Sequence, residues 1–321
     1  MCIEQEQRSR RGRLRWSVAV AAMIAASTYS AQAGVAETGE LRTGDPAGAI
    51  DGQPAAAAAG PQPGVTTTTI AGGPIGTSAL EAEFAALQSE LGGSMGLALM
   101  PVNGTQVITF GSWTDGNALS TIKVPLALAA LRRQPTELAD TAAAAITASD
   151  NDAAQALWQS LGTGDEAADA VEAVLREAGD TTTDVADRHD PNTTVRVDDP
   201  LSFGSTDWTL VNQVRFAAHL PCLPQANLVT SLMSQVTASQ SWGLGAFDGA
   251  AFKGGWAPDD STGYYTVRQF GIIPTPSGHL AVAMAAQPTS GSYDDATAML
   301  DRLTAVLGRH LGETSGGDCH A

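Results

Sequence analysis

The chain has little of what would suit it to nucleic acid, a membrane interior or a thiolate metal site. Of its 321 residues, 17 are Lys or Arg and 34 are Asp or Glu, so the formal net charge is −17. A chain this acidic repels phosphate groups, which argues against nucleic acid and anionic membrane surfaces as partners. No apolar run reaches the roughly 18 residues that a membrane span needs. Three cysteines are too few for a four-thiolate site or a disulfide framework.

Aromatic and charged side chains are also scarce, at 5% and 16%, whereas apolar residues make up 43%. The chain is long enough to bury a sizeable core, and Ala, Val and Leu must supply most of it. The histidines show no metal-ligand spacing, and no Gly-rich phosphate loop followed by Lys-Ser/Thr is present. We therefore expect neither a metal nor another cofactor.

Residues 1–33 have the order of an export signal. Five arginines between positions 8 and 15 precede an apolar stretch at 18–26 and a small-x-small cleavage pattern at 31–33. Residues 9–15 resemble a twin-arginine signal, and the alternative is an ordinary secretory signal rich in arginine. We predict an exported protein, periplasmic or extracellular. Removal of the signal takes away five Arg and two Glu, which changes the net charge from −17 to −20.

Residues 34–77 are rich in Gly, Ala, Pro and Thr and show neither strand nor helix periodicity, which predicts a flexible linker. Cleavage of the signal removes one cysteine and leaves Cys222 and Cys319. A remaining pair in an exported protein predicts one disulfide, which would pin the C-terminal tail at 312–321. The alternative is two unrelated thiols.

The globular domain is predicted to run from 78 to 311. Its residue periodicities predict a helix, a hairpin of two strands around Asn103-Gly104, a block of helices, three further strands and a last helix capped by Ser292. The predicted helices are 79–91, 120–133, 136–147, 165–178, 207–219 and 225–237; the strands are 95–100, 106–110, 250–254, 264–273 and 279–285; and 180–204 is a long loop.

This order predicts an α/β (α+β) fold. One five-stranded antiparallel sheet, flanked by the N- and C-terminal helices, would comprise residues 78–118 and 248–311. Residues 119–247 would form a mainly helical lobe. Gly92-Gly93-Ser94-Met95-Gly96 looks like a nucleophile elbow, but that motif needs a strand before it and a helix after it. Here the order is reversed, so we interpret it as a turn.

The chain has only two lysines, Lys123 and Lys253, and every other cationic side chain that it uses is arginine or histidine. A buried lysine can lose its proton near neutral pH, which arginine cannot do. Lys123 follows Ser120 by three residues, so on a helix the amine and the hydroxyl share one face. A neutral lysine there could activate the serine as a nucleophile. The alternative is a capping serine beside a surface lysine.

Two further motifs follow in the chain. Ser149-Asp150-Asn151 falls between two helical patterns, where its hydroxyl and amide could relay a proton and hold a substrate amide; the alternative is a cluster of helix caps. Lys253-Gly254-Gly255-Trp256 lies on a predicted strand whose glycine edge could admit a ligand backbone; the alternative is a loop at the strand end. Trp242 and Trp256 could floor a substrate site, although core packing is the usual place for tryptophan.

Taken in order, with both lysines inside it, this set resembles the penicillin-recognising serine hydrolases, and most closely the class A β-lactamases. That family carries Ser-x-x-Lys, Ser-Asp-Asn and Lys-Thr-Gly. The resemblance covers residues 78–311, and Ala144–Leu157 is the most similar stretch. It implies that Ser120 is the acylated nucleophile, Lys123 its proton acceptor and Ser149 a proton relay.

The resemblance further implies that Asn151 binds a substrate amide and that Lys253 lies near a substrate carboxylate. The backbone N–H groups of Ser120 and Trp256 would form the oxyanion hole, beside Gly254 and Gly255. Arg268 falls about where the family often places a carboxylate-binding arginine. The alternative for Arg268 is an arginine on the surface of the sheet.

Three departures from the family pattern limit the resemblance, and the third makes acylation a firmer expectation than turnover. Gly254 stands where the family has a hydroxyl residue, and only 29 residues separate Ser120 from Ser149, about half the family's usual gap. No glutamate matches the one that deacylates the family's acyl-enzyme. Asp190, on the long loop beside His189, is the nearest match, and a carboxylate misplaced by about 1 Å can cost on the order of 100-fold in rate.

The expectation from the sequence is thus an exported, monomeric serine hydrolase that opens a β-lactam amide through an acyl-enzyme. The alternatives are a D,D-carboxypeptidase that acts on D-Ala-D-Ala peptides of peptidoglycan, and a binding module that keeps the fold and has lost turnover. The partner in each case is a small molecule or cell-wall peptide.

Overall fold

The computed structural model describes residues 77–259 and 262–319. The predicted export signal and all of the predicted linker except Thr77 lie outside the described residues. Within the described ranges, none of the helices combines the length and the apolar character that crossing a bilayer requires.

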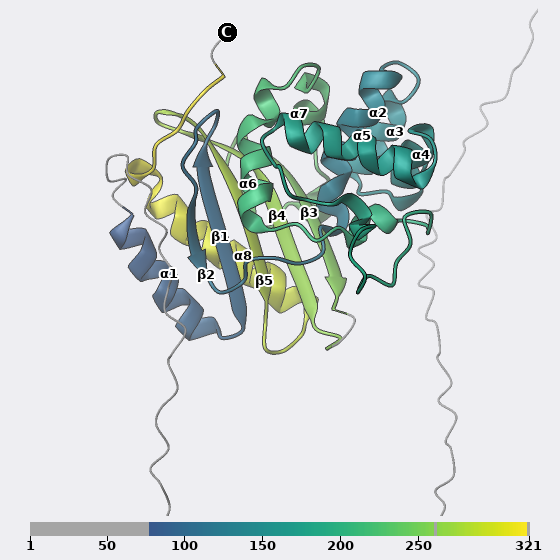
Figure 1. The fold of residues 1–321 in the computed structure, drawn as a ribbon. Helices are drawn as coiled ribbons and strands as arrows, with labels where there is room; N and C mark the ends of the chain where they lie inside the picture. Colours follow the sequence, from purple (N-terminus) through teal and green to yellow (C-terminus); the bar gives the residue numbers. More distant parts are fainter. Residues whose placement is uncertain (1–76, 260–261, 320–321) are drawn as a thin grey trace, which may run out of the picture. The chain divides into compact units, whose positions relative to one another are not determined.

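A five-stranded antiparallel sheet forms the centre of the fold, in the order β2-β1-β5-β4-β3 (Figure 1). The strands are β1 (Ser94–Pro101), β2 (Ile108–Gly111), β3 (Ala251–Pro258), β4 (Tyr265–Thr275) and β5 (Gly278–Gln287). The predicted α+β class and five-stranded antiparallel sheet are therefore confirmed. Strand β3, which carries Lys253, is an edge strand, so part of its backbone is not paired by a neighbouring strand.

The two faces of the sheet differ in residue size. Along β5, Ala281, Ala283 and Ala285 belong to one buried cluster, whereas the larger side chains between them belong to the other. Successive side chains of a strand point to opposite faces, so this alternation separates the two cores. The alanine face lies against α6 (Leu210–His219), because small side chains allow a helix to approach the strands closely.

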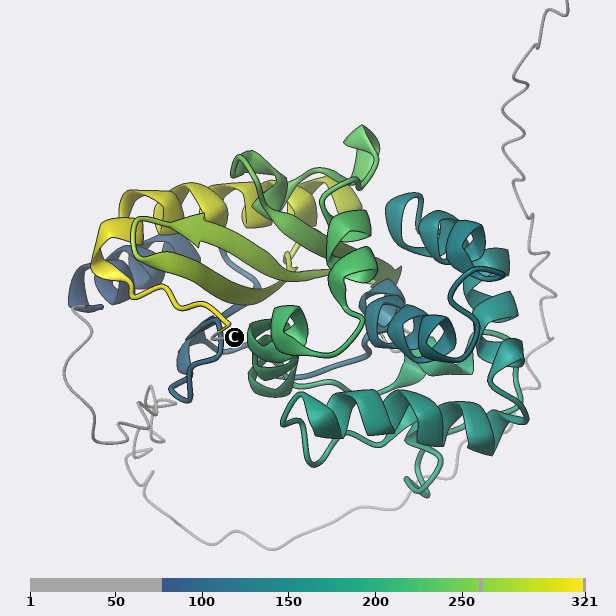
Figure 2. The same cartoon turned by 90° about the horizontal axis from the view of Figure 1, so that it is seen from above.

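The first and last helices cover the opposite face. Helix α1 (Ser78–Leu91) packs on α8 (Tyr293–Arg309), and α8 packs on β4 and β5. Figure 2 shows α1 and α8 together on one side of the sheet and α6 on the other. The Ser292 hydroxyl accepts a hydrogen bond from the Asp295 N–H, so the predicted N-cap of the last helix is confirmed.

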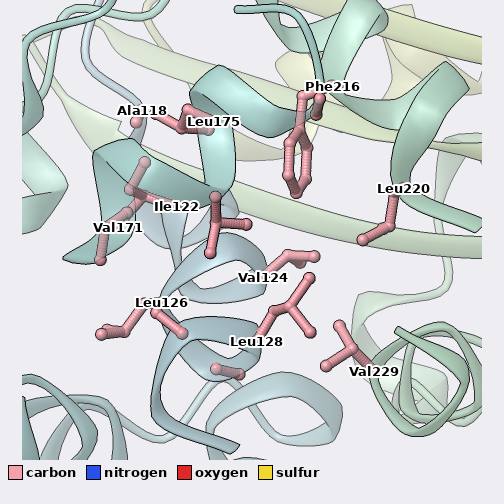
Figure 3. Packing of buried hydrophobic residues seen from close by; sticks show 14 of the residues in the cluster. Ala118, Ile122, Val124, Leu126, Leu128, Val171, Leu175, Phe216, Leu220 and Val229 are labelled. Carbon is pink, nitrogen blue, oxygen red and sulfur yellow. The ribbon is translucent and has the colours of Figure 1, made fainter. Parts of the chain in front are cut away.

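The remaining helices form a lobe around α2 (Lys123–Arg133), in which every residue from Lys123 to Leu131 is buried. Figure 3 shows side chains of this segment packed among Val171 and Leu175 of α5 and Phe216 of α6. The helices that surround α2 are α3 (Ala139–Thr147), α4 (Asn151–Ser160), α5 (Gly164–Glu177) and α7 (Asn227–Met233). The site described below thus has a rigid, fully packed helix beneath it.

Several element ends differ from those predicted. The predicted helix 207–219 begins at Leu210, because Thr209 caps it through a hydrogen bond from the Asn212 N–H. The helix predicted at 225–237 is limited to α7. The hairpin turn at Asn103-Gly104 exists, but β2 begins only at Ile108, so the connection is longer than a two-residue turn.

The C-terminal tail is fastened to the sheet. Cys222 and Cys319 form a disulfide with an S–S distance of 1.99 Å and a sequence separation of 97 residues. Gly317 and His279 exchange two backbone hydrogen bonds, of 2.8 and 2.9 Å, at the start of β5. The tail therefore continues the fold past α8.

Candidate active site

Ser120 lies in a tight 3-10 turn, Leu119–Ile122, that leads directly into α2. The first residue of the turn is strained. Leu119 has a φ of +54°, a left-handed conformation that is energetically unfavourable for a residue other than glycine. The Ala118 N–H donates to the Thr206 carbonyl at 2.7 Å, which anchors the turn to the end of the long loop. Pro125 is tolerated in α2 because the N–H groups of a helix's first turn have no intrahelical acceptor.

Strand β3 passes directly over this turn. A Cβ atom built on Gly255 would lie 2.8 Å from the Ser120 nitrogen and 2.9 Å from the Leu119 Cβ. No real side chain fits at such a distance, so glycine at this position is a steric requirement. The backbone of Gly255 therefore lies close to the backbone nitrogen of Ser120.

Lys123 and Lys253 converge on Ser149. Lys253 Nζ donates to Ser149 Oγ at 2.9 Å and to the Gly254 carbonyl at 2.8 Å. Lys123 Nζ lies 3.4 Å from the same hydroxyl oxygen, and donates to the Ser149 carbonyl at 2.7 Å and to Asn151 Oδ1 at 2.7 Å. The chain's two amines and the Ser149-Asp150-Asn151 motif thus form one hydrogen-bonded cluster.

Both amines are removed from solvent, with 1% of Lys123 and none of Lys253 exposed. Burial lowers the pKa of Lys123 to about 8, although the negative charge of Asp150 opposes the shift. Burial, and then the charge of Lys123, lowers the pKa of Lys253 well below its ordinary value. Among the described residues no carboxylate hydrogen-bonds to either amine, so the surroundings favour loss of a proton from the pair.

The Ser149-Asp150-Asn151 segment is a strained turn that starts α4. Ser149 has a φ of +59°, and the Asp150 carboxylate caps the helix by accepting from the Ala153 N–H at 2.8 Å. The predicted alternative of a capping cluster therefore holds for Asp150. Asn151 is exposed, its Oδ1 is held by Lys123, and its amide nitrogen makes no hydrogen bond within the described residues. That nitrogen can donate to a bound carbonyl.

The nucleophile candidate is not hydrogen-bonded to the amines. The spacing predicted that the Lys123 amine and the Ser120 hydroxyl share one face, but within residues 77–259 and 262–319 the hydroxyl that both amines approach is that of Ser149. Ser120 is half-buried and its hydroxyl makes no hydrogen bond to any described residue. Ser120 lies in the 3-10 turn and Lys123 is the first residue of α2, which begins where that turn ends. The candidate nucleophile and the amine therefore lie on adjoining elements.

Arg268 does not face a substrate, contrary to the prediction. Its side chain is fully buried, and its guanidinium donates to the carbonyls of Gly116, Asn117 and Trp208 at 2.7, 2.8 and 2.7 Å. It also donates to Gln213 Oε1 at 3.1 Å. The carbonyls of residues 116 and 117 immediately precede the turn with Ser120, so Arg268 braces this turn from beneath.

Two buried polar residues that sequence reasoning missed continue this brace. Gln213 Nε2 donates to the Thr121 hydroxyl at 2.9 Å, and that hydroxyl donates to the Ala118 carbonyl at 2.5 Å. Thr121 and Gln213 are both fully buried. The one signal in the sequence was a glutamine on the apolar face of the helix predicted at 207–219.

Asp190 is likewise not part of the cluster. It is exposed, and its carboxylate accepts from the backbone and side-chain nitrogens of Asn192 at 2.8 and 3.0 Å. It lines a hollow in the helical lobe together with Asp165, Arg196 and Asp198. The contacts of Asp190 therefore do not support the deacylating role that we expected for it. The loop has no periodicity, so the sequence gave no means of placing this carboxylate.

A different part of the long loop lies against the turn that carries Ser120. The Leu201 N–H donates to Gln155 Oε1 on α4 at 2.7 Å, one helical turn beyond Asn151. A Cβ on Gly204 would lie 3.9 Å from the Leu119 carbonyl oxygen. The sequence from 201 to 206, Leu-Ser-Phe-Gly-Ser-Thr, contains no carboxylate.

Within the described residues no three His, Cys, Asp or Glu side chains are grouped as metal ligands would be. Together with the hydroxyl of Ser120, the cluster offers two amines, two hydroxyls and an amide for chemistry.

The arrangement as a whole is that of the class A β-lactamase fold. A β-lactamase from Mycobacterium abscessus, described as class A, superposes with a TM-score of 0.54 and 18% identity, over 73% of this chain and 99% of that one. The TLA-1 extended-spectrum β-lactamase gives 0.58 and 16%, over 74% and 99%. A β-lactamase from Streptosporangium roseum gives 0.54 and 16%, over 73% and 99%.

At these identities the likeness establishes the fold and leaves the activity to be argued from the site. No protein-family model and no curated protein sequence matches the chain. The resemblance seen in the sequence is thus confirmed at the level of structure.

Proposed function

We propose that the protein is an exported serine hydrolase that is acylated at Ser120 by a strained or activated amide of the β-lactam type, and that releases the acyl group slowly. The observation that carries this proposal is the convergence of Lys123 and Lys253 on Ser149 Oγ, where no carboxylate from the described part of the chain is bonded to either amine. A buried amine that loses its proton easily is the group that a serine nucleophile needs.

In the proposed first step, neutral Lys123 takes the proton of the Ser120 hydroxyl as Oγ attacks the amide carbonyl carbon. The oxygen that becomes negative is stabilised by the backbone N–H groups of Ser120 and Trp256. Support for this placement is the close approach of Gly255 to the Ser120 nitrogen, which brings β3 to the nucleophile turn.

In the second step the carbon–nitrogen bond breaks and the leaving nitrogen receives a proton from Ser149. Ser149 recovers a proton from Lys123, whose Nζ is 3.4 Å away, while Lys253 stabilises the relay hydroxyl from 2.9 Å. Protons are thereby conserved: the proton lost by Ser120 ends on the leaving nitrogen. Asn151 holds the substrate by donating from its free amide nitrogen.

Hydrolysis of the acyl-enzyme requires a base that activates water. The loop segment 201–206, which lies beside the turn that carries Ser120, has no carboxylate. The carboxylate of Asp207, just after it, accepts from the Gly116 N–H at 3.0 Å, and Asp190 is hydrogen-bonded elsewhere. General-base catalysis typically contributes 10²–10⁴-fold in rate. We therefore expect the acyl-enzyme to be long-lived, which also favours the penicillin-binding, D,D-peptidase-like alternative over rapid turnover.

The test follows intact mass and β-lactam absorbance together, after the mature protein is mixed with benzylpenicillin. We expect a stoichiometric adduct on Ser120, formed without rapid loss of absorbance. Ser120→Ala is the control and should form no adduct. Fast catalytic loss of absorbance without a lasting adduct would show an efficient lactamase instead. If neither an adduct nor a loss of absorbance is observed, the acyl-enzyme proposal is wrong and the protein is a binding module with this fold.

A further inference from the structure

The space beside Gly254 is filled by an aromatic ring. A Cβ atom built on Gly254 would lie 2.7 Å from Cη2 and 2.9 Å from Cζ2 of Trp242. A residue with a side chain at position 254 would therefore have to displace the indole. In the sequence, Gly254 was notable only because it lacks a hydroxyl. The structure shows that the indole of Trp242 occupies the space that a side chain at position 254 would need.

Trp242 is fixed in place by its own segment. Its carbonyl accepts from Gln269 Nε2 on β4 at 2.9 Å, and the N–H of Gly243 donates to Asp301 of α8 at 2.6 Å. The Leu244 N–H donates to Gln269 Oε1 at 2.7 Å. The backbone of residues 242–244 is thus fixed by hydrogen bonds to β4 and α8, and this places the indole against β3.

Trp242 is one end of a chain of aromatic rings along this edge of the sheet. Its ring centroid lies 6.3 Å from that of Trp256, Trp256 lies 5.9 Å from Tyr293, and Tyr293 lies 5.8 Å from Tyr265. All four are partly exposed. In a chain with only 5% aromatic residues, this concentration beside the candidate nucleophile needs an explanation.

No cation in this region is available to an anionic ligand. Between positions 237 and 275 the only Lys or Arg residues are Lys253 and Arg268. Both are fully buried and donate to oxygens of the protein. Asp294 and Asp295, in the first turn of α8 next to Tyr293, add negative charge to the same edge. A carboxylate placed against Trp242 would lose water and gain no cation among the described residues of this segment.

We propose, building on the proposed acyl-enzyme function, that Trp242 is the specificity-determining residue of the site. It selects acyl donors whose leaving group is uncharged and apolar at the position beside Gly254. We place the leaving group along the edge of β3 because Lys253, which precedes Gly254 and points to the opposite face, contacts the relay hydroxyl of Ser149 through its amine. Flat apolar surfaces gain from contact with aromatic rings, whereas a carboxylate does not.

The test compares benzylpenicillin with its methyl ester, two acyl donors that differ only in the charge beside the leaving nitrogen. The second-order rate of adduct formation on Ser120 is followed by intact mass, and each value is divided by that compound's alkaline hydrolysis rate in solution. We expect the wild-type protein to prefer the ester by about tenfold or more. An equal or greater rate with the free acid would overturn the inference.

A pair of substitutions makes the test specific to the ring. Trp242→Ala combined with Gly254→Thr opens the space and supplies a hydroxyl, and should lower the preference for the ester at least about tenfold. Trp242→Phe, which keeps an aromatic face, should retain the preference. If the double variant does not melt cooperatively, the single variant Trp242→Leu, with Gly254 unchanged, takes its place in the test. Preference for the ester that survives in both Trp242→Leu and the double variant would refute the role of Trp242.

The two proposals fail in different ways. If neither compound labels Ser120 in the folded wild-type protein, the acyl-enzyme function is wrong and the specificity inference falls with it. If both compounds label Ser120 but the ratio does not favour the ester, the function stands and only the inference about Trp242 is wrong.

Discussion

Lys123 and Lys253 direct their Nζ atoms at one oxygen, the Oγ of Ser149, from 3.4 and 2.9 Å. The first comes from α2 in the helical lobe and the second from β3 at the edge of the sheet, so a single hydroxyl links the two halves of the fold. Two buried ammonium groups to which no carboxylate of the described residues is bonded repel each other, and the charge of Lys123 adds to the lowering of the Lys253 pKa. The arrangement therefore supplies a base near neutral pH without a histidine.

The pH dependence of acylation should report this amine. Burial lowers the pKa of Lys123 to about 8. The form that accepts the proton of Ser120 is the neutral one, whose fraction increases as the pH rises through that pKa. We therefore expect the rate of adduct formation, measured by intact mass between pH 6 and 10, to rise with a midpoint of about 8.

Lys123→Arg is the control for this profile, because a guanidinium keeps its proton throughout the range. The variant should form the adduct about 100-fold more slowly or worse, and without an inflection. An unchanged profile in Lys123→Arg would show that another group accepts the proton.

Asn151 offers a way to move the same midpoint in a chosen direction. Its Oδ1 accepts from Lys123 Nζ at 2.7 Å, so Asn151→Asp places a negative charge of nearly the same shape against the amine. An opposite charge at this distance favours the protonated amine and shifts a pKa by about 1–3 units. The midpoint should move to higher pH, and the rate at pH 7 should fall about tenfold or more.

Asn151→Ala is the matched substitution. It removes an acceptor from the charged form of Lys123, so the midpoint should move to lower pH. Both variants lose the amide that would hold the substrate, so weaker binding is common to them. Midpoints that move in the same direction would argue that Lys123 is not the group observed.

Arg268 is expected to act as a positioning residue. It joins the carbonyls of Gly116 and Asn117 to Trp208, directly ahead of the turn that carries Ser120. Arg268→Lys keeps the charge but cannot span these oxygens at once. We expect the maximal acylation rate to fall roughly 10–100-fold while the concentration of penicillin that gives half the maximal rate changes little. If only the concentration of penicillin at half the maximal rate changed, Arg268 would contact the substrate, as the sequence predicted.

What the sequence could reveal depended on how local each feature is. The i, i+3 spacing of Ser120 and Lys123, and the rarity of lysine, marked the two amines because both signals lie in the sequence itself. Alternation along the strands likewise predicted the sheet. The partners of Arg268 are backbone carbonyls more than 50 residues away, which no periodicity reveals. Trp242 lies 12 positions before Gly254, and the structure brings its indole onto that residue.

The long loop was the least predictable part, because it lacks periodicity and its shape depends on left-handed residues. Ala186, Asp187 and Leu201 have φ values of +61°, +44° and +63°. Such turns at non-glycine residues have no reliable sequence signal. The choice of Asp190 over other loop carboxylates therefore had only its place in the sequence to support it.

Asp187 in this loop should make stability depend on pH. Its carboxylate accepts from the Asp207 N–H at 2.8 and 3.1 Å, and burial, followed by nearby carboxylates, raises its pKa to about 7. The folded chain therefore keeps a proton that the unfolded chain loses near pH 4. Stability falls as the pH rises from about 4 to 7, and this loss is complete above pH 7.

Asp187→Asn keeps an oxygen for the Asp207 N–H and removes the charge. Because the side chain is only half-buried, solvent screens much of the effect. We expect a gain of about 1 kcal/mol at pH 8, or roughly 2–4 °C in melting temperature for a domain of this size, and a smaller gain at pH 4. Asp248→Asn, at an exposed carboxylate that is not among those raising the pKa of Asp187, is the control. An equal gain at both pH values would show that Asp187 does not carry a raised pKa.

The Cys222–Cys319 disulfide should contribute to stability through the unfolded chain, because it closes a loop of 97 residues. Loss of such a link typically costs about 2–4 kcal/mol, so Cys222→Ser should lower the melting temperature by roughly 4–16 °C. Cys319→Ser should lower it equally, and the double variant should match either single one, because the bridge is already absent. Losses that add up in the double variant would mean that the two thiols act separately. Intact mass before and after reduction provides the independent check, since a closed bridge gains two hydrogen atoms when it is reduced.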